Sequence, residues 1–358
     1  MPDMRFSPPN PLRIADRTSG LNAVRVRSHN ERLVLSMLLR NGNISRLKIG
    51  ESSGLSAQTV SVIVRSLEKE GLIVSGSAQK GRVGPPTIPL SLNAEGAYSI
   101  GISIGIRKTH VVLINFLGEI TAHSQFSHEF PGNDIVHPDI FVAVEELLSK
   151  LSVKKRERVA GIGLALADTF RESEALNVLR ELLEKEFSLE VFIQTDITSA
   201  ASGESMFGKA KNLENYLFFY IGAQIHSRLV LNHQILRSAT SATYDGGTLE
   251  LEKRLGSDNL SINELEQLTE QESQHSKDLQ EWTEQCSALI REKLRDASQF
   301  VDVEALLLSS YIPNTMLQNI STALVLPETG PEVVVSELTK APKAVGAASL
   351  PFAGRFML

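Results

Sequence analysis

Cysteine, tryptophan and long apolar runs are scarce in this chain of 358 residues. The single cysteine, Cys286, excludes an intrachain disulfide and any zinc site built from several cysteines. We expect Cys286 to be a small side chain within a helical stretch around Trp282. No apolar run approaches the roughly 20 residues that span a bilayer, and the first ten residues lack the apolar centre of a signal peptide. The sequence therefore predicts a soluble cytoplasmic protein with no membrane partner.

Charge is distributed unevenly along the chain. Residues 1–93 hold 13 Lys and Arg against 6 Asp and Glu, whereas the remainder holds 23 against 36. A basic segment attached to an acidic one is typical of a polyanion-binding module joined to a domain of another kind. The length allows two or three domains at roughly 100–200 residues each.

Three helices are predicted near the N-terminus. Residues 30–40 place apolar side chains on one helical face, and a second helix over 45–53 ends at Gly54. Ser56 can cap the start of a third helix over 57–70. The apolar stripe of that third helix consists of Val60, Ile63, Val64 and Leu67.

Two short strands, 72–75 and 88–92, follow these helices and enclose a polar turn. Two helices joined by a tight glycine-containing turn, with a hairpin after them, form the pattern of a winged helix-turn-helix. We assign residues 23–93 to this DNA-binding domain and residues 1–22, which show little periodicity, to a flexible arm.

Small polar and basic side chains on this domain are candidate DNA contacts. Hydroxyl and amide groups at the start of the third helix suit the major groove, and basic side chains on the hairpin suit phosphates or the minor groove. Chance patterns and solvated polar faces are the alternative explanation. The candidate residues are Arg46, Ser56, Gln58, Thr59, Ser61, Arg65, Lys80 and Arg82.

From Tyr98 onward the pattern changes to that of an α/β domain. Apolar stretches rich in Ile and Val alternate with amphipathic helices, and Gly118 marks a hairpin turn. Residues 249–300 contain three charged amphipathic stretches, which predict helices. The last predicted helix begins at Val345. We treat residues 94–358 as one large body.

Several motifs, in order along the chain, are similar to the ROK family of repressors, open reading frames and sugar kinases. Residues 55–61 (LSAQTVS) resemble the recognition helix of its repressors, and 80–86 (KGRVGPP) their wing. Residues 101–105 (GISIG), 161–163 (GIG) and 345–350 (VGAASL) resemble the first phosphate loop, a core strand and the terminal helix. The resemblance implies an α/β fold in which a winged helix-turn-helix precedes a two-lobed body of the actin-like ATPase and sugar-kinase type.

The body departs from the family's kinases at its phosphate loops. Ser103 and Ile106 stand where the resemblance leads us to expect an acidic residue and a glycine. Gln224, His226 and Arg228 stand where the second loop would carry glycines, which permit close backbone approach to phosphate. These side chains are expected to fill the phosphate site, so we predict no catalytic residue and no nucleotide cofactor.

The metal and sugar elements also differ. The resemblance implies a His and a cysteine-rich zinc loop, but this part of the chain has no cysteine, so we predict no metal. Asp196 resembles the general base of the family's kinases, and it could instead cap a helix beginning near Thr198. The candidate sugar-binding residues are Asp196, Glu204 and, as a positional substitute for a missing element, Asp245.

These observations predict a transcriptional regulator, a repressor of carbohydrate uptake or catabolism, without enzymatic activity. The expected partners are double-stranded DNA with a pseudo-palindromic operator, a sugar effector, and a second copy of the chain in a homodimer or higher homo-oligomer. Two alternatives remain: a regulator whose body only dimerises or binds a protein, and an ATP-dependent sugar kinase.

Overall fold

A computed structural model describes most of the chain. The described residues are 28–78, 88–105, 108–128, 135–167, 170, 173–236, 242–257, 260–269 and 276–358. The chain divides into two compact units. The first comprises Met1–Leu164, Glu172–Gln194 and Ala347–Leu358, and the second comprises Ala165–Arg171 and Thr195–Gly346.

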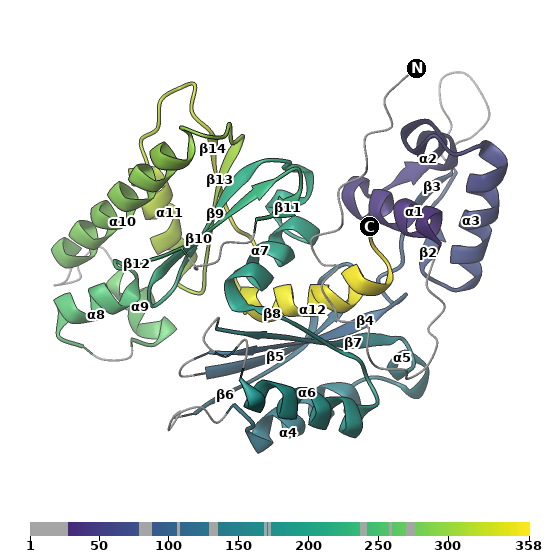
Figure 1. Ribbon diagram of the computed structural model, residues 1–358, viewed down its shortest axis with the longest axis horizontal. Coiled ribbons are helices and arrows are strands. Elements are labelled where there is room, and N and C mark those ends of the chain that lie inside the picture. The colour runs from purple at the N-terminus through teal and green to yellow at the C-terminus, as the bar shows by residue number, and fades with distance from the viewer. Residues whose placement is uncertain are drawn as a thin grey trace. The chain divides into compact units, whose positions relative to one another are not determined.

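The N-terminal part of the first unit contains three helices and a small sheet (Figure 1). The sheet has the strand order β1-β3-β2, in which β3 pairs antiparallel with both neighbours. Its elements are α1 (His29–Asn41), β1 (Ile44–Ser45), α2 (Arg46–Ser53), α3 (Ala57–Lys69), β2 (Ile73–Ser75) and β3 (Pro89–Leu92). The three predicted helices and both predicted strands are therefore present, with ends shifted by a residue or two.

A five-stranded sheet with the order β6-β5-β4-β7-β8 forms the rest of the first unit. Helices α4 and α6 cover one face and the later part of α12 covers the other (Figure 1). Strands β4 and β7 are buried along their whole length, as expected for central strands covered on both faces. The elements are β4 (Tyr98–Ile104), β5 (Lys108–Asn115), β6 (Ile120–Ser127), α4 (Pro138–Ser149), α5 (Val153–Arg156), β7 (Val159–Leu166), α6 (Glu174–Phe187), β8 (Val191–Thr195) and α12 (Pro342–Arg355).

Helix α12 packs directly on the backbone of β7. A Cβ atom at Gly163 would lie 1.8 Å from the carbonyl oxygen of Ala347, so any side chain there would push the helix off the sheet. Gly163, the second glycine of the segment 161–163, therefore allows the close packing of α12 on β7.

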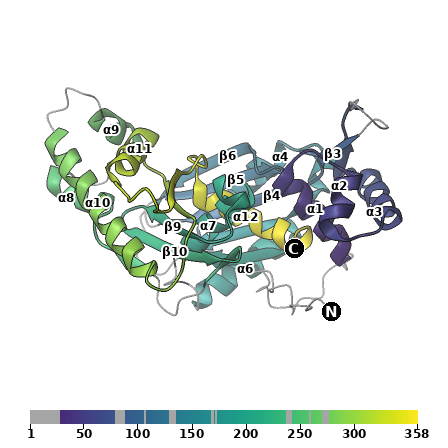
Figure 2. The same cartoon turned by 90° about the horizontal axis from the view of Figure 1, so that it is seen from above.

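The second unit contains a six-stranded sheet, with the order β11-β10-β9-β13-β14 and β12 paired to β10. Strand β13 runs parallel to both β9 and β14, whereas β9 and β10 form an antiparallel hairpin. Helices α10 and α11 lie side by side in Figures 1 and 2. The elements are α7 (Asp196–Met206), β9 (Tyr216–Ile221), β10 (Ile225–Leu231), β11 (Gln234–Ile235), β12 (Ala242–Tyr244), α8 (Thr248–Leu255), α9 (Ile262–Leu268), α10 (Ser276–Ala297), β13 (Ala305–Ser310), α11 (Asn314–Ala323) and β14 (Glu332–Val335).

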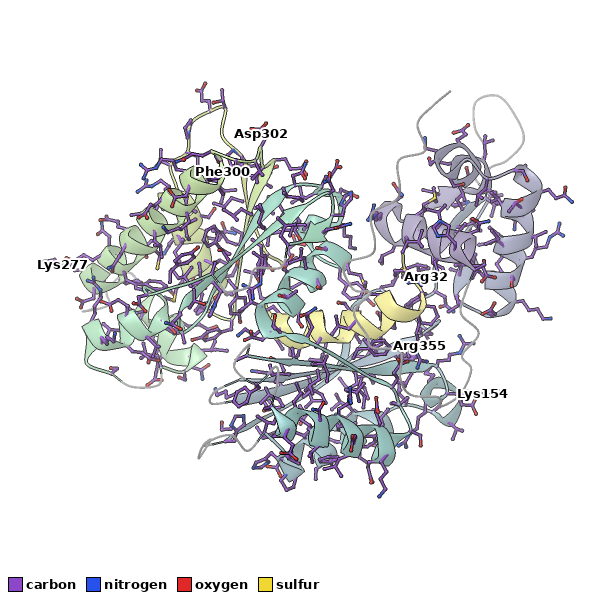
Figure 3. The ribbon with its side chains drawn as sticks, in the orientation of Figure 1. Arg32, Lys154, Lys277, Phe300, Asp302 and Arg355 are labelled. Atoms are coloured by element: carbon purple, nitrogen blue, oxygen red, sulfur yellow. The ribbon has the colours of Figure 1, made fainter. Side chains whose placement is uncertain are left out.

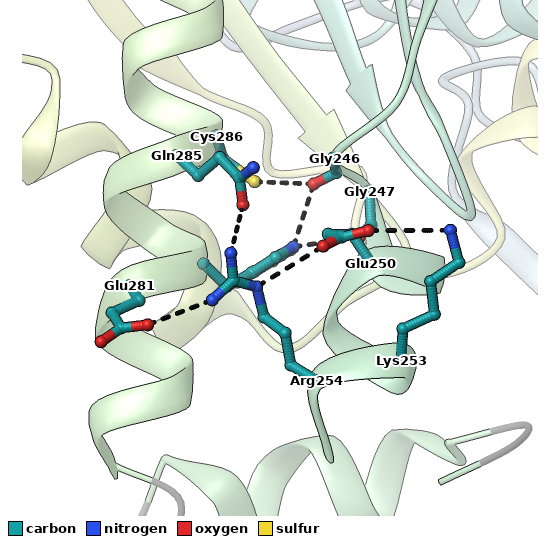
Figure 4. Close-up of polar contacts among 9 residues, drawn as sticks. Gly246, Gly247, Glu250, Lys253, Arg254, Glu281, Gln285 and Cys286 are labelled. Carbon is teal, nitrogen blue, oxygen red and sulfur yellow. Dashed lines mark hydrogen bonds and ion pairs between the residues drawn. The ribbon is translucent and has the colours of Figure 1, made fainter. Parts of the chain in front are cut away.

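The charged helices predicted over 249–300 are present as α8, α9 and α10, and they enclose an apolar centre at Trp282. The Trp282 indole is completely buried and its Nε1 donates to the carbonyl oxygen of Gly246 at 3.0 Å. Cys286 is buried beside it, with its Sγ 3.0 Å from the same oxygen, as predicted (Figure 4). Arg254 joins α8 to α10 through Glu281 at 3.2 Å (Figure 4). These helices therefore have a structural role in the core of the second unit.

Several elements were not predicted. They are β13 and α11 and the short elements β1, α5, β11 and β12. Helix α12 was predicted to begin at Val345 but begins at Pro342. Pro342 opens the helix because proline needs no amide partner in the first turn. Among the described residues, no helix combines the length and apolar character that a bilayer crossing requires.

Candidate functional site

The turn between α2 and α3 is fixed by two residues. Gly54 ends α2 with φ at 71°, a left-handed conformation that favours glycine. Ser56 caps α3, since its Oγ accepts the N–H of Thr59 at 3.1 Å. These local signals set the angle at which α3 leaves the turn.

Helix α3 is strongly two-sided. Full burial of an apolar side chain stabilises a fold by about 1.5–3 kcal/mol, and four such side chains hold α3 in place. They are Val60, Ile63, Val64 and Leu67. Gln58 and Arg65 are exposed on the opposite side. The helix is therefore anchored by one face and presents the other to solvent, as a recognition helix must.

The three small hydroxyl residues among the predicted DNA contacts are used within α3 itself. The hydroxyls of Ser56 and Thr59 lie 2.9 Å apart, and the Ser61 hydroxyl donates to the carbonyl oxygen of Ala57 at 2.8 Å. A hydroxyl keeps acceptor capacity after donating one bond. A role for these residues in DNA binding stays a prediction, now with a second role in holding the helix start.

The basic candidates fall into two groups. Arg46 pairs with Glu68 at 3.3 Å and its side chain is 44% exposed. An exposed pair of this kind is worth about 0–1 kcal/mol, so a phosphate can replace Glu68 at little cost. Lys80 and Arg82 lie outside the described residues.

The DNA-binding helices are joined to the C-terminal end of α12 by Arg32 of α1. The Arg32 guanidinium donates to the carbonyl oxygens of Ala353 at 2.9 Å and Met357 at 2.6 Å (Figure 3). The last carbonyls of a helix lack intrahelical partners and carry partial negative charge, so a guanidinium is well suited to them. The backbone N–H of Leu358 also donates to the Ser36 hydroxyl at 2.9 Å.

In the second unit, Asp196 is held in an ion pair. It is the first residue of α7, and its Oδ1 accepts the N–H of Ile197 at 2.8 Å. Its Oδ2 accepts from the Lys343 ammonium at 2.5 Å, and that ammonium lies 4.7 Å from the centre of the Tyr220 ring. Burial by itself raises the pKa of Asp196, but the charge and hydrogen bond of Lys343 bring it below its ordinary value.

His226 and Arg228 of β10 belong to the same cluster. The His226 Nδ1 lies 3.0 Å from the Thr243 hydroxyl, and the Arg228 Nε donates to the Thr198 hydroxyl at 3.1 Å. Burial, and then the positive charge of Lys343, lowers the pKa of His226 to about 4. The imidazole is therefore neutral near pH 7, and the positive charge next to Asp196 is that of Lys343.

The turn between β9 and β10 is the position predicted for the second phosphate loop. The carbonyl oxygens of Gly222 and Ala223 accept the N–H groups of Thr248 and Leu249 at 2.8 and 3.1 Å. A Cβ atom at Gly247 would lie 2.3 Å from the Gly222 oxygen, so the start of α8 is packed directly on the turn. Carbonyl oxygens packed against a helix start differ from the free amides that bind phosphate.

The two remaining sugar-binding candidates differ in their surroundings. Glu204 of α7 is completely buried, and its carboxylate accepts from the Ser336 hydroxyl and, at 3.3 Å, from the N–H of Lys209. Burial raises its pKa to about 7. Asp245 is exposed and accepts from the Gln224 side chain at 3.2 Å. The burial of Glu204 favours a structural role, and sugar binding by Asp245 stays a prediction.

Lys343 is the functional candidate that the sequence analysis missed. It lies 147 residues from Asp196 along the chain. One signal was present: a lysine in the first turn of a helix is unfavourable to the helix dipole, so it needs another partner. The sequence alone did not show this signal, because the predicted helix began at Val345 and left Lys343 outside it, whereas α12 begins at Pro342.

Comparisons with known proteins match both parts of the chain. Residues 27–74 match the family described as winged helix-turn-helix DNA-binding, and residues 99–242 match the family described as ROK. A xylose repressor of Bacillus spizizenii is 24% identical over 67% of this chain and 63% of its own length. The alignment thus spans less than two thirds of that repressor.

Solved structures agree with this division. A ROK family transcriptional regulator, a homologue of the Escherichia coli MLC protein, matches 91% of this chain and 96% of its own with a TM-score of 0.65 at 16% identity. A glucokinase of Streptomyces griseus matches 71% of this chain and 99% of its own with a TM-score of 0.53 at 15% identity. The N-terminal winged helix-turn-helix and the sugar-kinase type of fold predicted for the body are both confirmed.

Proposed function

We propose, since this chain belongs to the ROK family and carries a winged helix-turn-helix, that it is a DNA-binding transcriptional regulator that represses genes of carbohydrate uptake or catabolism. The observation that carries this proposal is α3, which is anchored by one buried stripe and exposes Gln58 and Arg65 on the other face. The printed name of the matched relative, a xylose repressor, supports the carbohydrate link. Such a regulator acts on the chromosome, and we place it in the cytoplasm.

The operator is proposed to be pseudo-palindromic and read by two copies of the chain, because a two-fold protein assembly matches a two-fold DNA site. Arg46, Ser56, Gln58, Thr59, Ser61 and Arg65 are the proposed contacts from the described residues, with Lys80 and Arg82 on the predicted wing. Arg65, on the exposed face, is the residue best placed to test them.

The body is proposed to bind a sugar effector without phosphorylating it. Lys343 lowers the pKa of Asp196, and a carboxylate that holds protons weakly is a poor general base. The packed turn at Gly222 and the side chains of His226 and Arg228 also occupy the place predicted for a phosphate loop. These features favour a regulator over a kinase.

A route from effector to DNA is offered by α12. Its first turn places Lys343 on Asp196, and its C-terminal end receives Arg32 of the DNA-binding helices. A sugar hydroxyl that binds Asp196 in competition with Lys343 would favour one state of this helix, as differential binding requires.

DNA binding is tested by selecting genomic fragments with the purified full-length chain, followed by affinity measurements on the selected site over a range of salt concentrations. Arg65→Ala is expected to weaken binding and to reduce the slope of log K against log salt by about 0.9, the value of one phosphate contact. Arg295→Ala, an exposed arginine in the last turn of α10, is the matched control. Equal affinity and slope for Arg65→Ala and wild type would refute the assignment of α3.

Effector binding is tested by thermal shift with a panel of sugars. A ligand that binds only the folded state must raise the melting temperature. We expect a sugar that stabilises wild type and loses its effect in Asp196→Asn. The absence of any such sugar would favour the alternative in which the body only dimerises or binds a protein. Phosphate transfer from ATP to a sugar would favour the kinase.

A further inference from the structure

An exposed valine interrupts the polar face of α3. Val62 is 61% exposed. It lies between Gln58 and Arg65 along the helix and, at about 100° per residue, about 40° and 60° from them around the axis, on the side opposite the buried stripe. A β-branched side chain has lower helix propensity than alanine, and an exposed one gains little from burial. Other exposed valines, such as Val142 of α4, lie elsewhere, and Val62 is set apart by its place beside Gln58 and Arg65 on the exposed face of the recognition helix.

The neighbours of Val62 indicate the chemistry of a contact at this face. Gln58 carries the amide group that bonds adenine at N6 and N7 in the major groove, and Arg65 carries a positive charge for guanine or phosphate. The major groove offers one apolar group, the C5-methyl of thymine. A stripe with an amide, two methyl groups and a guanidinium thus matches base edges better than it matches an apolar protein surface.

We propose that Val62 reads a thymine methyl in each operator half-site. Gln58 and Val62 are four residues apart, a rise of about 6 Å along the helix, so the thymine lies one or two base pairs from the base that Gln58 contacts. This inference rests on the proposed DNA binding and adds to it a determinant of sequence specificity.

The experiment first removes the methyl group of thymine from the DNA and then removes the γ-methyl groups of Val62 from the protein. The full-length chain selects its site from random-sequence duplexes, and each thymine of one half-site is then replaced in turn by deoxyuridine, which lacks only that methyl. Affinity is measured by fluorescence anisotropy at one fixed salt concentration, because the contribution of phosphate contacts to affinity depends on salt. Val62→Ala is compared with wild type, and Val142→Ala, a 66% exposed valine of α4, is the matched control.

At one thymine, deoxyuridine should weaken the binding of wild type and of Val142→Ala about fourfold, the effect of burying one methyl group. Val62→Ala should lose less affinity than wild type when deoxyuridine replaces that thymine, because alanine lacks the two γ-methyl groups of valine. Its fold should be preserved, since alanine at an exposed helical site raises helix propensity.

Three outcomes would overturn the proposal while leaving DNA binding intact. These are a selected motif without thymine, wild-type affinity that no deoxyuridine changes, and a Val62→Ala variant that keeps the sensitivity of wild type. A Val62→Ala variant that instead changes the oligomeric state would assign Val62 to a protein contact. Failure to select any motif would overturn the proposed function itself.

Discussion

Replacement of Glu204 by glutamine should change how the stability of this protein depends on pH. Glu204 is completely buried in α7, and burial raises its pKa from 4.5 to about 7 in the folded state. The unfolded chain releases this proton near pH 4.5, whereas the folded chain keeps it until about pH 7. The folded state therefore loses stability relative to the unfolded state as pH rises through this window, and the full cost is present above pH 7.

The size of the effect follows from the two pKa values. At about 1.36 kcal/mol per pKa unit, the full cost is about 3.4 kcal/mol, of which about 2.5 kcal/mol develops between pH 5 and 8. His226 acts in the opposite direction, because its pKa is lowered to about 4 and the folded state gains stability as pH rises from 4 toward 6.5. Wild type alone would show the sum of these two groups and of the other groups that titrate.

The quantity to measure is therefore the difference in the free energy of unfolding between the variant and wild type at each pH. Urea unfolding of Glu204→Gln and wild type at pH 5, 6, 7 and 8 should show the variant gaining about 2.5 kcal/mol relative to wild type over this range. Glu181→Gln, an exposed glutamate of α6, is the control and should keep a constant difference. A constant difference for Glu204→Gln as well would refute the argument that burial keeps this carboxyl protonated.

Two further predictions concern packing. Arg32→Ala should destabilise the first unit by about 1.5–3 kcal/mol, the contribution of a hydrogen bond to a charged group, and should speed amide hydrogen exchange at the end of α12. Arg40→Ala, at an exposed position of the same helix α1, should do neither. Trp282→Phe should cost about 1–3 kcal/mol in the second unit, because it leaves a cavity and removes the donor to Gly246. Phe300→Ala, at an 86% exposed position, should stay within about 0.5 kcal/mol in the same thermal or urea unfolding measurement.

The DNA-binding helices could be predicted because their signals are local. Gly54 and Ser56 end one helix and begin the next through backbone conformation and a cap three residues away. The apolar stripe of α3 is likewise a repeat within one helix, and the structure has it buried as predicted. Strand β13 was missed because its apolar run carries no clear boundary, and its place between β9 and β14 depends on distant partners.

The candidate sugar-binding residues were harder to assess from sequence. In the sequence, Asp196 and Glu204 are two carboxylates eight positions apart, and nothing near them along the chain distinguishes their surroundings. In the structure, Asp196 is paired with Lys343 and has a lowered pKa, whereas Glu204 is buried beside Ser336 and has a raised one. The lowered pKa of Asp196 comes from Lys343, 147 positions away, and the raised pKa of Glu204 comes from its burial in the folded chain.

The sequence by itself determined the order of the domains, the helix-turn-helix and the loss of the glycines expected in a phosphate loop, because each depends on residue types at short spacing. Only the tertiary structure decided which charges meet: Lys343 with Asp196, and Arg32 with the end of α12. The physical reason is that an ion pair and a raised or lowered pKa depend on distance and burial in space, and separation along the chain fixes neither.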